Sequence, residues 1–324
     1  MERAVGFVIA LLLLILVAAG DRVAPNDAAR QFDDRAWSPP MRLRLNEGTA
    51  FVNAQTLEDR IARSFAEDAS RPVALEWFAR GRLVAPEDPG AAEPVLLLGA
   101  DALGRDVLAR VAAAARWSLG VAVTGALLAL ALGTLLGALA VSGGQRLDRA
   151  VVSVADALAS LPVIYIVLTL RAALPLVLTP ADVFLTLALL FGAVGWPLTA
   201  RGVRGILRRE RALPYAEAAR AAGASRARVL RVHLLPASTG FLGTQFLLLV
   251  PGFLLSEVTL SFLGLGFPEP TPSWGTMLQA AANVRVMAEA PWMLAPAALI
   301  ALTSLAMHLA AGRRPRRDAA VLSH

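Results

Sequence analysis

Few side chains in this sequence could carry out covalent or metal chemistry. The 324 residues include three histidines, no cysteine and no lysine, and the histidines His233, His308 and His324 lie too far apart to share a metal ion at ligand spacing. No Gly-x-Ser-x-Gly nucleophile motif is present, and without lysine the ATP-binding phosphate loop is excluded as well. The sequence therefore predicts no catalytic residue, no metal site and no cofactor bound by this chain itself.

Carboxylates inside apolar runs are the remaining candidates for functional chemistry. Asp156 lies about two turns into the run at residues 151–170, and Glu257 lies at the end of the run at 237–257. Burying an unpaired carboxylate in hydrocarbon is costly, so such a group can mark a transport pathway. A structural role stays open for both, because each lies near an interface where it can reach water or a backbone partner. Ser261 and Gly264, which follow Glu257, are candidates for the same pathway or gate.

The composition places these residues in a membrane. Hydrophobic residues make up 56% of the chain and the mean hydropathy is +0.59, more than a soluble core can use. We therefore predict an all-α polytopic membrane protein with six transmembrane helices. The first run also resembles a signal peptide, because Val17-Ala18-Ala19 is typical of a cleavage site, so residues 1–20 are either a retained helix or a cleaved signal. The six apolar runs are 4–19, 117–141, 151–170, 183–200, 237–257 and 292–311.

Arginine alternates from one predicted loop to the next. The loop at 201–236 contains nine arginines, whereas the connections at 171–182 and 258–291 contain one each. Because short cytoplasmic loops carry the excess of basic residues, we expect the 201–236 loop and both termini in the cytoplasm. The same bias accounts for the net charge of +6, so nucleic acid is not an expected partner.

A charged, proline-bearing segment separates the first two runs, and we predict that it forms a small mixed α/β extracytoplasmic insertion. Alternating apolar residues predict strands at 41–45, 49–52 and 73–77 around a turn at 46–48, while Leu57, Ile61 and Phe65 recur at helical spacing. The expected domains are an N-terminal helix at 1–20, the insertion at 21–96, the transmembrane domain at 97–312 and a cytoplasmic tail at 313–324.

The arginine-rich loop contains a pattern of its own, EAARAAGASRARVLRVHLLP at residues 217–236. Its alanine-rich start predicts a slim helix, which Gly223 can end in a left-handed conformation, and Ser225 can cap a second helix. The spacing resembles the EAA loop in permease subunits of ABC importers. In that family the loop forms a coupling helix that sits in a groove on the ATPase subunit. The resemblance implies ATPase coupling for Glu217, Ala218, Ala219, Gly223, Leu235 and Pro236.

Two further motifs are similar to those of dipeptide/oligopeptide-type permeases. One resembles Gly-Thr-Asp-x-x-Gly-Arg-Asp, with Ala100 in place of threonine, although the residues alone predict an amphipathic interfacial helix over 98–110. The other is LSFLGLG at 260–266 followed by TPSWG at 271–275. The resemblance covers residues 97–311, and the chain departs from it where 311–314 replace a Gly-Asp-Gly-type stretch. The first motif consists of Gly99, Asp101, Gly104, Arg105 and Asp106.

The resemblance implies a subunit of the bacterial inner membrane that takes up peptides. It also implies a second homologous permease, two ATPase subunits that bind ATP and Mg, an extracytoplasmic substrate-binding protein and surrounding membrane lipid as partners. A nickel or other small-solute permease stays open, because nickel permeases share these motifs. A membrane-anchored extracytoplasmic enzyme or sensor, or a secondary transporter, is less favoured, since catalytic groups and mid-membrane charges are scarce.

Overall fold

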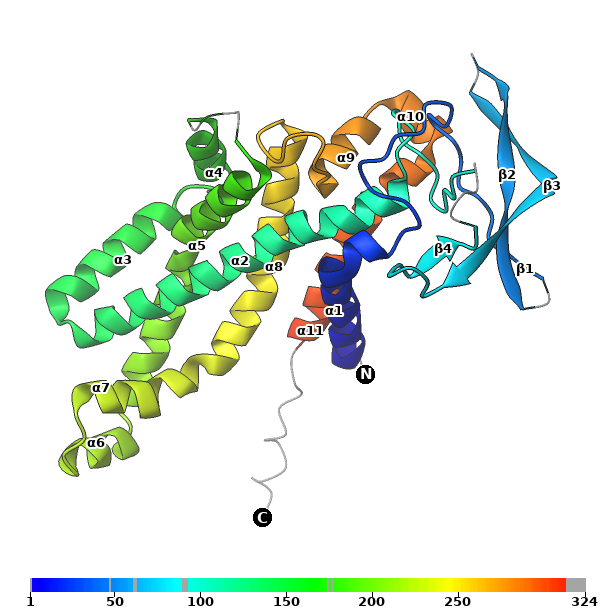
Figure 1. Cartoon of the computed structure of the whole chain (residues 1–324). Helices are drawn as coiled ribbons and strands as arrows, with labels where there is room; N and C mark the ends of the chain where they lie inside the picture. The colour runs from blue at the N-terminus through cyan, green and yellow to red at the C-terminus, as the bar shows by residue number, and fades with distance from the viewer. Residues whose placement is uncertain are drawn as a thin grey trace, which may run out of the picture.

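Long apolar helices make up most of the protein (Figure 1). The computed structural model describes residues 2–46, 48–60, 63–88, 93–173, 175 and 178–312. Within them, five helical stretches are long and apolar enough to cross a membrane, and a bent pair would make a sixth. The five stretches are Arg3–Arg22, Val107–Ser142, Pro180–Arg211, Arg226–Phe262 and Pro291–Ala311.

The helices and strands of the described residues follow one another in the order labelled in Figure 1. They are α1 (Glu2–Ala19), a 3-10 turn (Gly20–Arg22), β1 (Arg44–Asn46), β2 (Thr49–Asp59), β3 (Ser64–Trp77), β4 (Val84–Pro86), α2 (Val107–Ser142), α3 (Gln145–Ala159), α4 (Val163–Ala172), α5 (Pro180–Arg211), α6 (Pro214–Ala221), α7 (Arg226–Arg228), a π-helical turn (Val229–Leu234), a 3-10 turn (Leu235–Ser238), α8 (Thr239–Phe262), α9 (Trp274–Ala281), α10 (Val284–Glu289), a 3-10 turn (Pro291–Leu294) and α11 (Ala295–Ala311).

The predicted third span, 151–170, is not one continuous helix. α3 ends at Ala159 and α4 begins at Val163, and the candidate pair bends by 85° at the break. Pro162 is the N-cap residue of α4, and a proline lacks the backbone N–H that would continue α3. The residues that the structure describes therefore contain five candidate spans, or six if the bent pair counts as one, and the number of six stays a prediction.

Small residues bring α2 and α5 into close contact. A Cβ placed on Gly133 would lie 2.5 Å from Thr199 Cβ, and one on Gly125 would lie 2.7 Å from Phe191 Cβ. On Gly137 it would lie 2.7 Å from the carbonyl oxygen of Ala200. Glycine at these three positions lets the two helix backbones approach, which is the usual means of packing helices in a membrane.

The first helix is part of the same bundle. Gly6 of α1 faces Ala306 and Ala310 of α11, and a Cβ at Gly6 would lie 2.6 Å from Ala310 N. The Arg3 Nε donates a hydrogen bond to the carbonyl of Ala310 at 3.2 Å. At the other end of the helix, Gly20 packs against the backbone of Ala112 in α2. α1 is thus held at both ends by the bundle helices.

The segment between α1 and α2 forms a sheet instead of the predicted mixed α/β element. Four antiparallel strands pair in the order β1-β2-β3-β4. The strands predicted at 49–52 and 73–77 lie within β2 and β3, whereas the one predicted at 41–45 overlaps β1 only from Arg44 onward. The predicted helix is wrong, because Leu57 lies in β2 and faces Phe65 in β3 as its cross-strand partner. Ile61 lies outside the described residues. A spacing of four is also an even spacing, so it fits one face of a strand as well as a helix.

Candidate functional site

The loop that resembles the EAA motif forms a short helix, α6, at one end of the bundle (Figure 1). Pro214 is its first residue, where the missing backbone N–H costs nothing. Ala216 is fully buried and packs with Val203 and Leu207 of α5, whereas Glu217 and Ala218 are exposed. One face of α6 is therefore fixed to α5, and the opposite face is open to a partner.

Gly223 ends this helical segment as the sequence predicts. Its φ is +84°, and no atom lies within 4 Å of the position that a Cβ would take. Glycine is therefore favoured at this position because the backbone is left-handed, and not because a side chain would lack space. The Ser225 hydroxyl then accepts a hydrogen bond from Arg228 N at 3.3 Å and caps the next helical turn.

The second half of the loop differs from the single helix that was expected. α7 is only one turn long, and the chain continues through the π-helical and 3-10 turns into α8. The apolar run predicted at 237–257 lies within the candidate span Arg226–Phe262, and α8 itself begins at Thr239, because Pro236 lies in the 3-10 turn. Ala219 and Leu235 are half-buried, while Gly223 and Pro236 are exposed, so the six motif residues do not share one surface.

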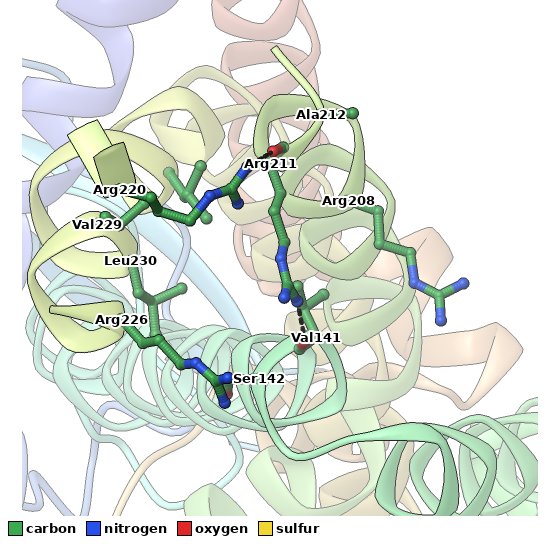
Figure 2. Close-up of a pocket in the computed structure, with 10 residues that line it drawn as sticks. Val141, Ser142, Arg208, Arg211, Ala212, Arg220, Arg226, Val229 and Leu230 are labelled. Atoms are coloured by element: carbon green, nitrogen blue, oxygen red, sulfur yellow. Dashed lines mark hydrogen bonds between the residues drawn. The ribbon is translucent and has the colours of Figure 1, made fainter. Parts of the chain in front are cut away.

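A cavity of about 540 Å³ lies between this loop and the ends of α2 and α5 (Figure 2). The Arg211 guanidinium donates to the carbonyl of Val141 at 2.9 Å, and Arg220 donates to the carbonyl of Arg211 at 3.4 Å. These two side chains satisfy carbonyls at helix C-termini, where positive charge is favourable. Arg208 and Arg226 also line the cavity, which is therefore strongly basic.

Charged side chains fasten the helices around this loop, and sequence reasoning missed these pairings. Arg204 binds both carboxylate oxygens of Asp148 at 2.5 and 2.9 Å, and Arg208 adds a contact at 2.7 Å. The bidentate geometry joins α5 to the start of α3. The Tyr215 hydroxyl donates to Glu210 Oε2 at 2.8 Å, and this bond raises the pKa of Tyr215. It ties α6 to the end of α5.

The motif before α2 is a tight loop, so the predicted amphipathic helix over 98–110 is wrong before Val107. Gly99 and Gly104 have φ of +70° and +69°, which a helix does not contain. A Cβ at Gly104 would collide with the carbonyl of Phe32, so only glycine fits there. Asp106 ends the loop and caps α2 by accepting hydrogen bonds from Leu108 N and Ala109 N at 2.9 and 3.3 Å.

Two arginines and two carboxylates of this region form a network that we call the outer quartet: Asp101, Arg105, Arg110 and Glu269. Arg105 contacts Asp101 Oδ2 at 2.7 Å and Glu269 Oε2 at 2.8 Å. Arg110 contacts Glu269 Oε1 at 3.2 Å and Asp101 Oδ2 at 3.6 Å. Both arginines and Asp101 are buried, whereas the Glu269 side chain is 56% exposed. The motif thus joins the start of α2 to the segment before α9, a partner that the sequence did not indicate.

Asp106 also connects α2 to the insertion. Its Oδ2 accepts a hydrogen bond from Asn26 Nδ2 at 2.9 Å, and Asn26 also donates to the carbonyl of Val95. Burial raises the pKa of Asp106 to about 6, against the smaller opposite effect of these hydrogen bonds and those of the helix cap.

The candidate pathway residues do not form one group. Asp156 lies on α3, is 58% exposed in its side chain and pairs with Arg201 of α5. Glu257 is fully buried, and its Oε1 accepts a hydrogen bond from Ser261 Oγ at 2.6 Å. The structure therefore brings Glu257 and Ser261 together. Gly264 is exposed at φ +78° in the turn after α8 and does not join them.

The sequence matches a known family and several curated relatives. Residues 129–313 match the family model described as the inner membrane component of binding-protein-dependent transport systems. The chain is 36% identical over 211 residues to a peptide permease protein of Brucella ovis, covering 65% of this chain and 68% of the relative. It is 36% identical over 207 residues to the oligopeptide transport system permease protein OppC of Haemophilus influenzae, covering 63% and 64%.

Another relative and one solved structure extend the comparison. OppC of Bacillus subtilis is 34% identical over 206 residues, covering 63% of this chain and 65% of the relative. Among solved structures, the inward-facing MetNI methionine ABC transporter gives a TM-score of 0.44 at 20% identity, over 61% of this chain and 94% of the other. A structural similarity with this TM-score adds nothing to the family match. The matched segment spans about two thirds of the length of each curated relative.

Proposed function

Because the chain belongs to the family of inner membrane components of binding-protein-dependent transport systems, we propose that it is a permease subunit of an ABC importer for peptides. Family members of this kind form the membrane pathway and leave ATP hydrolysis to separate subunits. The peptide cargo is inferred from relatives in Brucella ovis and Haemophilus influenzae, whose names specify peptide and oligopeptide permeases. The chain is a multi-pass protein of a bacterial inner membrane.

The observation that carries the ATPase coupling is the two-sided character of α6. Its buried residue Ala216 packs on α5, and the Tyr215 hydroxyl binds Glu210, so α6 cannot move without pulling on the end of α5. Glu217 and Ala218 lie on the free surface, where a groove on an ATPase could receive them. ATP-driven movement of the ATPase would thus act on a membrane helix through a short rigid contact.

The distribution of arginine is the basis of the proposed orientation in the membrane. With the arginine-rich α6 end in the cytoplasm, both termini are cytoplasmic, and the sheet and the outer quartet lie outside. The sheet would then face an extracytoplasmic substrate-binding protein or the second homologous permease, and two ATPase subunits complete the transporter. Glu257 and Ser261 are proposed as part of the pathway wall or gate. The pairing of Asp156 with Arg201 favours a structural role for Asp156.

Replacing Glu217 by tryptophan tests the coupling. The expected result for Glu217→Trp is a normal amount of chain in the membrane, loss of ATPase copurification and loss of labelled-peptide uptake. Gln145→Trp is the matched control, because Gln145 is exposed at the first position of α3, at the same end of the bundle but outside the loop. Normal ATPase binding and uptake in Glu217→Trp would rule out the assigned role of α6.

A further inference from the structure

The turn between β3 and β4 exposes an unusual amount of apolar surface. We call residues 77–83 the hairpin tip. Within it, Trp77 is 50% exposed and Phe78 is 81% exposed, and Leu83 adds a further 39% exposed side chain. An isolated exposed aromatic residue is ordinary, but two consecutive ones with an exposed leucine across the turn concentrate apolar surface in one short segment, which water does not favour.

The backbone holds this patch in a fixed shape. Phe78 and Arg80 have φ of +56° and +53°, a left-handed backbone conformation that residues other than glycine rarely adopt. The turn is closed by a hydrogen bond from Phe78 N to the carbonyl of Leu83 at 2.9 Å. The Arg80 guanidinium donates to the carbonyls of Pro86 and Glu87 at 2.6 and 2.5 Å. The turn is thus built to present Phe78 outward and is not a loose loop.

The hairpin tip is attached to the end of α1 (Figure 1). Leu83 N donates to the carbonyl of Arg22 at 2.6 Å, and the Arg82 guanidinium donates to the carbonyls of Ala24 and Asn26 at 2.9 and 2.8 Å. The candidate span Arg3–Arg22 has 20 residues, so it is about 30 Å long and just crosses the hydrocarbon layer. Arg22 must therefore lie at a membrane surface, and the hairpin tip lies there with it.

The chemistry of the hairpin tip matches that position. Aromatic side chains collect where the hydrocarbon meets the headgroups, and arginine pairs with lipid phosphate. The side of α1 that carries Phe7, Leu11 and Leu14 is exposed and apolar, so the lipid that would cover it extends up to the level of Arg22. A protein partner that covered Phe78 would have to enter the headgroup layer, whereas lipid is already there.

We propose that the hairpin tip inserts into the headgroup region of the membrane leaflet at the C-terminal end of α1 and binds phospholipid there. Phe78 and Trp77 rest on the upper acyl chains, and the exposed Arg22 lies at the level of the phosphates. The sheet is then anchored to the bilayer at one end and projects away from it at the other. This proposal requires only that α1 crosses a membrane, and it holds whatever the transporter carries.

Photo-crosslinking in cells tests the contact on the complete, tagged chain expressed with its partner subunits. p-Benzoyl-phenylalanine replaces Phe78, a conservative change at an exposed position, in cells whose phospholipids contain radiolabelled phosphate. The control position is Ser64, which is exposed at the other end of β3. The 14 residues of β3 place that position about 40 Å away along the strand.

After irradiation, the expected product at position 78 is a chain that carries the phosphate label and has gained the mass of one phospholipid. Position 64 is expected to give no label above the sample kept in the dark. A protein-sized adduct at position 78, no adduct at all, or equal lipid labelling at position 64 would each overturn the proposal. None of these outcomes depends on peptide uptake, so failure here is separate from failure of the proposed transport function.

Discussion

Changing Asp101 to asparagine should destabilise the protein far more than removing the other carboxylate of the outer quartet. Asparagine has the same shape, and its side-chain oxygen can still accept the hydrogen bonds that Asp101 Oδ1 accepts from Leu103 N and Arg105 N at 2.9 and 3.0 Å. The loop before α2 is therefore kept. What is lost is one negative charge beside two buried arginines. In addition, the new amide N–H₂ would replace Asp101 Oδ2, which now accepts a hydrogen bond from Arg105 Nε at 2.7 Å, so two donors would face each other.

The size of the loss follows from burial. The quartet has two positive and two negative side chains, so Asp101→Asn leaves one excess positive charge among groups that are 10% exposed or less. Removing one partner of a buried pair costs about 3 kcal/mol or more. Glu269→Gln removes a charge that is 56% exposed, where water screens it, and the expected loss is at most about 1 kcal/mol.

Thermal unfolding of the purified chain in detergent, followed by tryptophan fluorescence, measures the difference. We expect Asp101→Asn to lower the Tm by roughly 5–10 °C and Glu269→Gln by no more than about 3 °C. The charge-balanced double variant with Arg105→Gln should recover part of the loss, because the excess cation is gone. If the two single variants lower the Tm equally, the burial argument is refuted.

Three further changes have expected outcomes. Because the folded state binds a proton at Asp106 with a pKa of about 6, the free energy of unfolding should fall by up to about 3 kcal/mol as the pH rises from 4 to 7. Asp106→Asn should remove this pH dependence, as Tm measured against pH would show. Gly133→Leu should cost about 3 kcal/mol by forcing α2 off α5, whereas Gly252→Leu, where a Cβ meets no atom within 4 Å, should leave the Tm nearly unchanged. Tyr215→Phe should speed hydrogen exchange of α6 amides by removing a bond worth about 1 kcal/mol, with α5 amides as the internal reference.

Features that depend on neighbouring residues were predictable from the sequence. A stretch of about twenty apolar residues is long enough to span by itself, and α1, α2, α5, α8 and α11 were found where such stretches occur. The break at Gly223 was also predictable, because an alanine-rich helix followed by glycine has a local reason to end in a left-handed turn.

Features that depend on distant residues were not predictable. Glu269 meets Arg105 across 164 positions of the chain, and no spacing rule points to that partner. The helix expected over 57–65 failed because a spacing of four residues suits both a helix and a strand, and pairing with the neighbouring strand decided the outcome. The helix predicted over 98–110 was wrong before Val107 for a similar reason. Its apolar residues fit one helical face, but Gly104 is held against Phe32, far away in the sequence.

α2 connects the two regions whose sequences resemble permease motifs. The helix has 36 residues and is about 54 Å long, with Asp106 as its cap at one end and the Val141 carbonyl held by Arg211 at the other. Between these ends, Gly133 and its neighbouring glycines keep α5 in direct backbone contact, and closely packed helices resist sliding. In the proposed coupling, movement that reaches α5 through α6 would therefore be shared with α2. The same movement would then reach the outer quartet, where α2 begins, because the arginine-rich loop and the outer quartet lie at the two ends of one closely packed pair of helices.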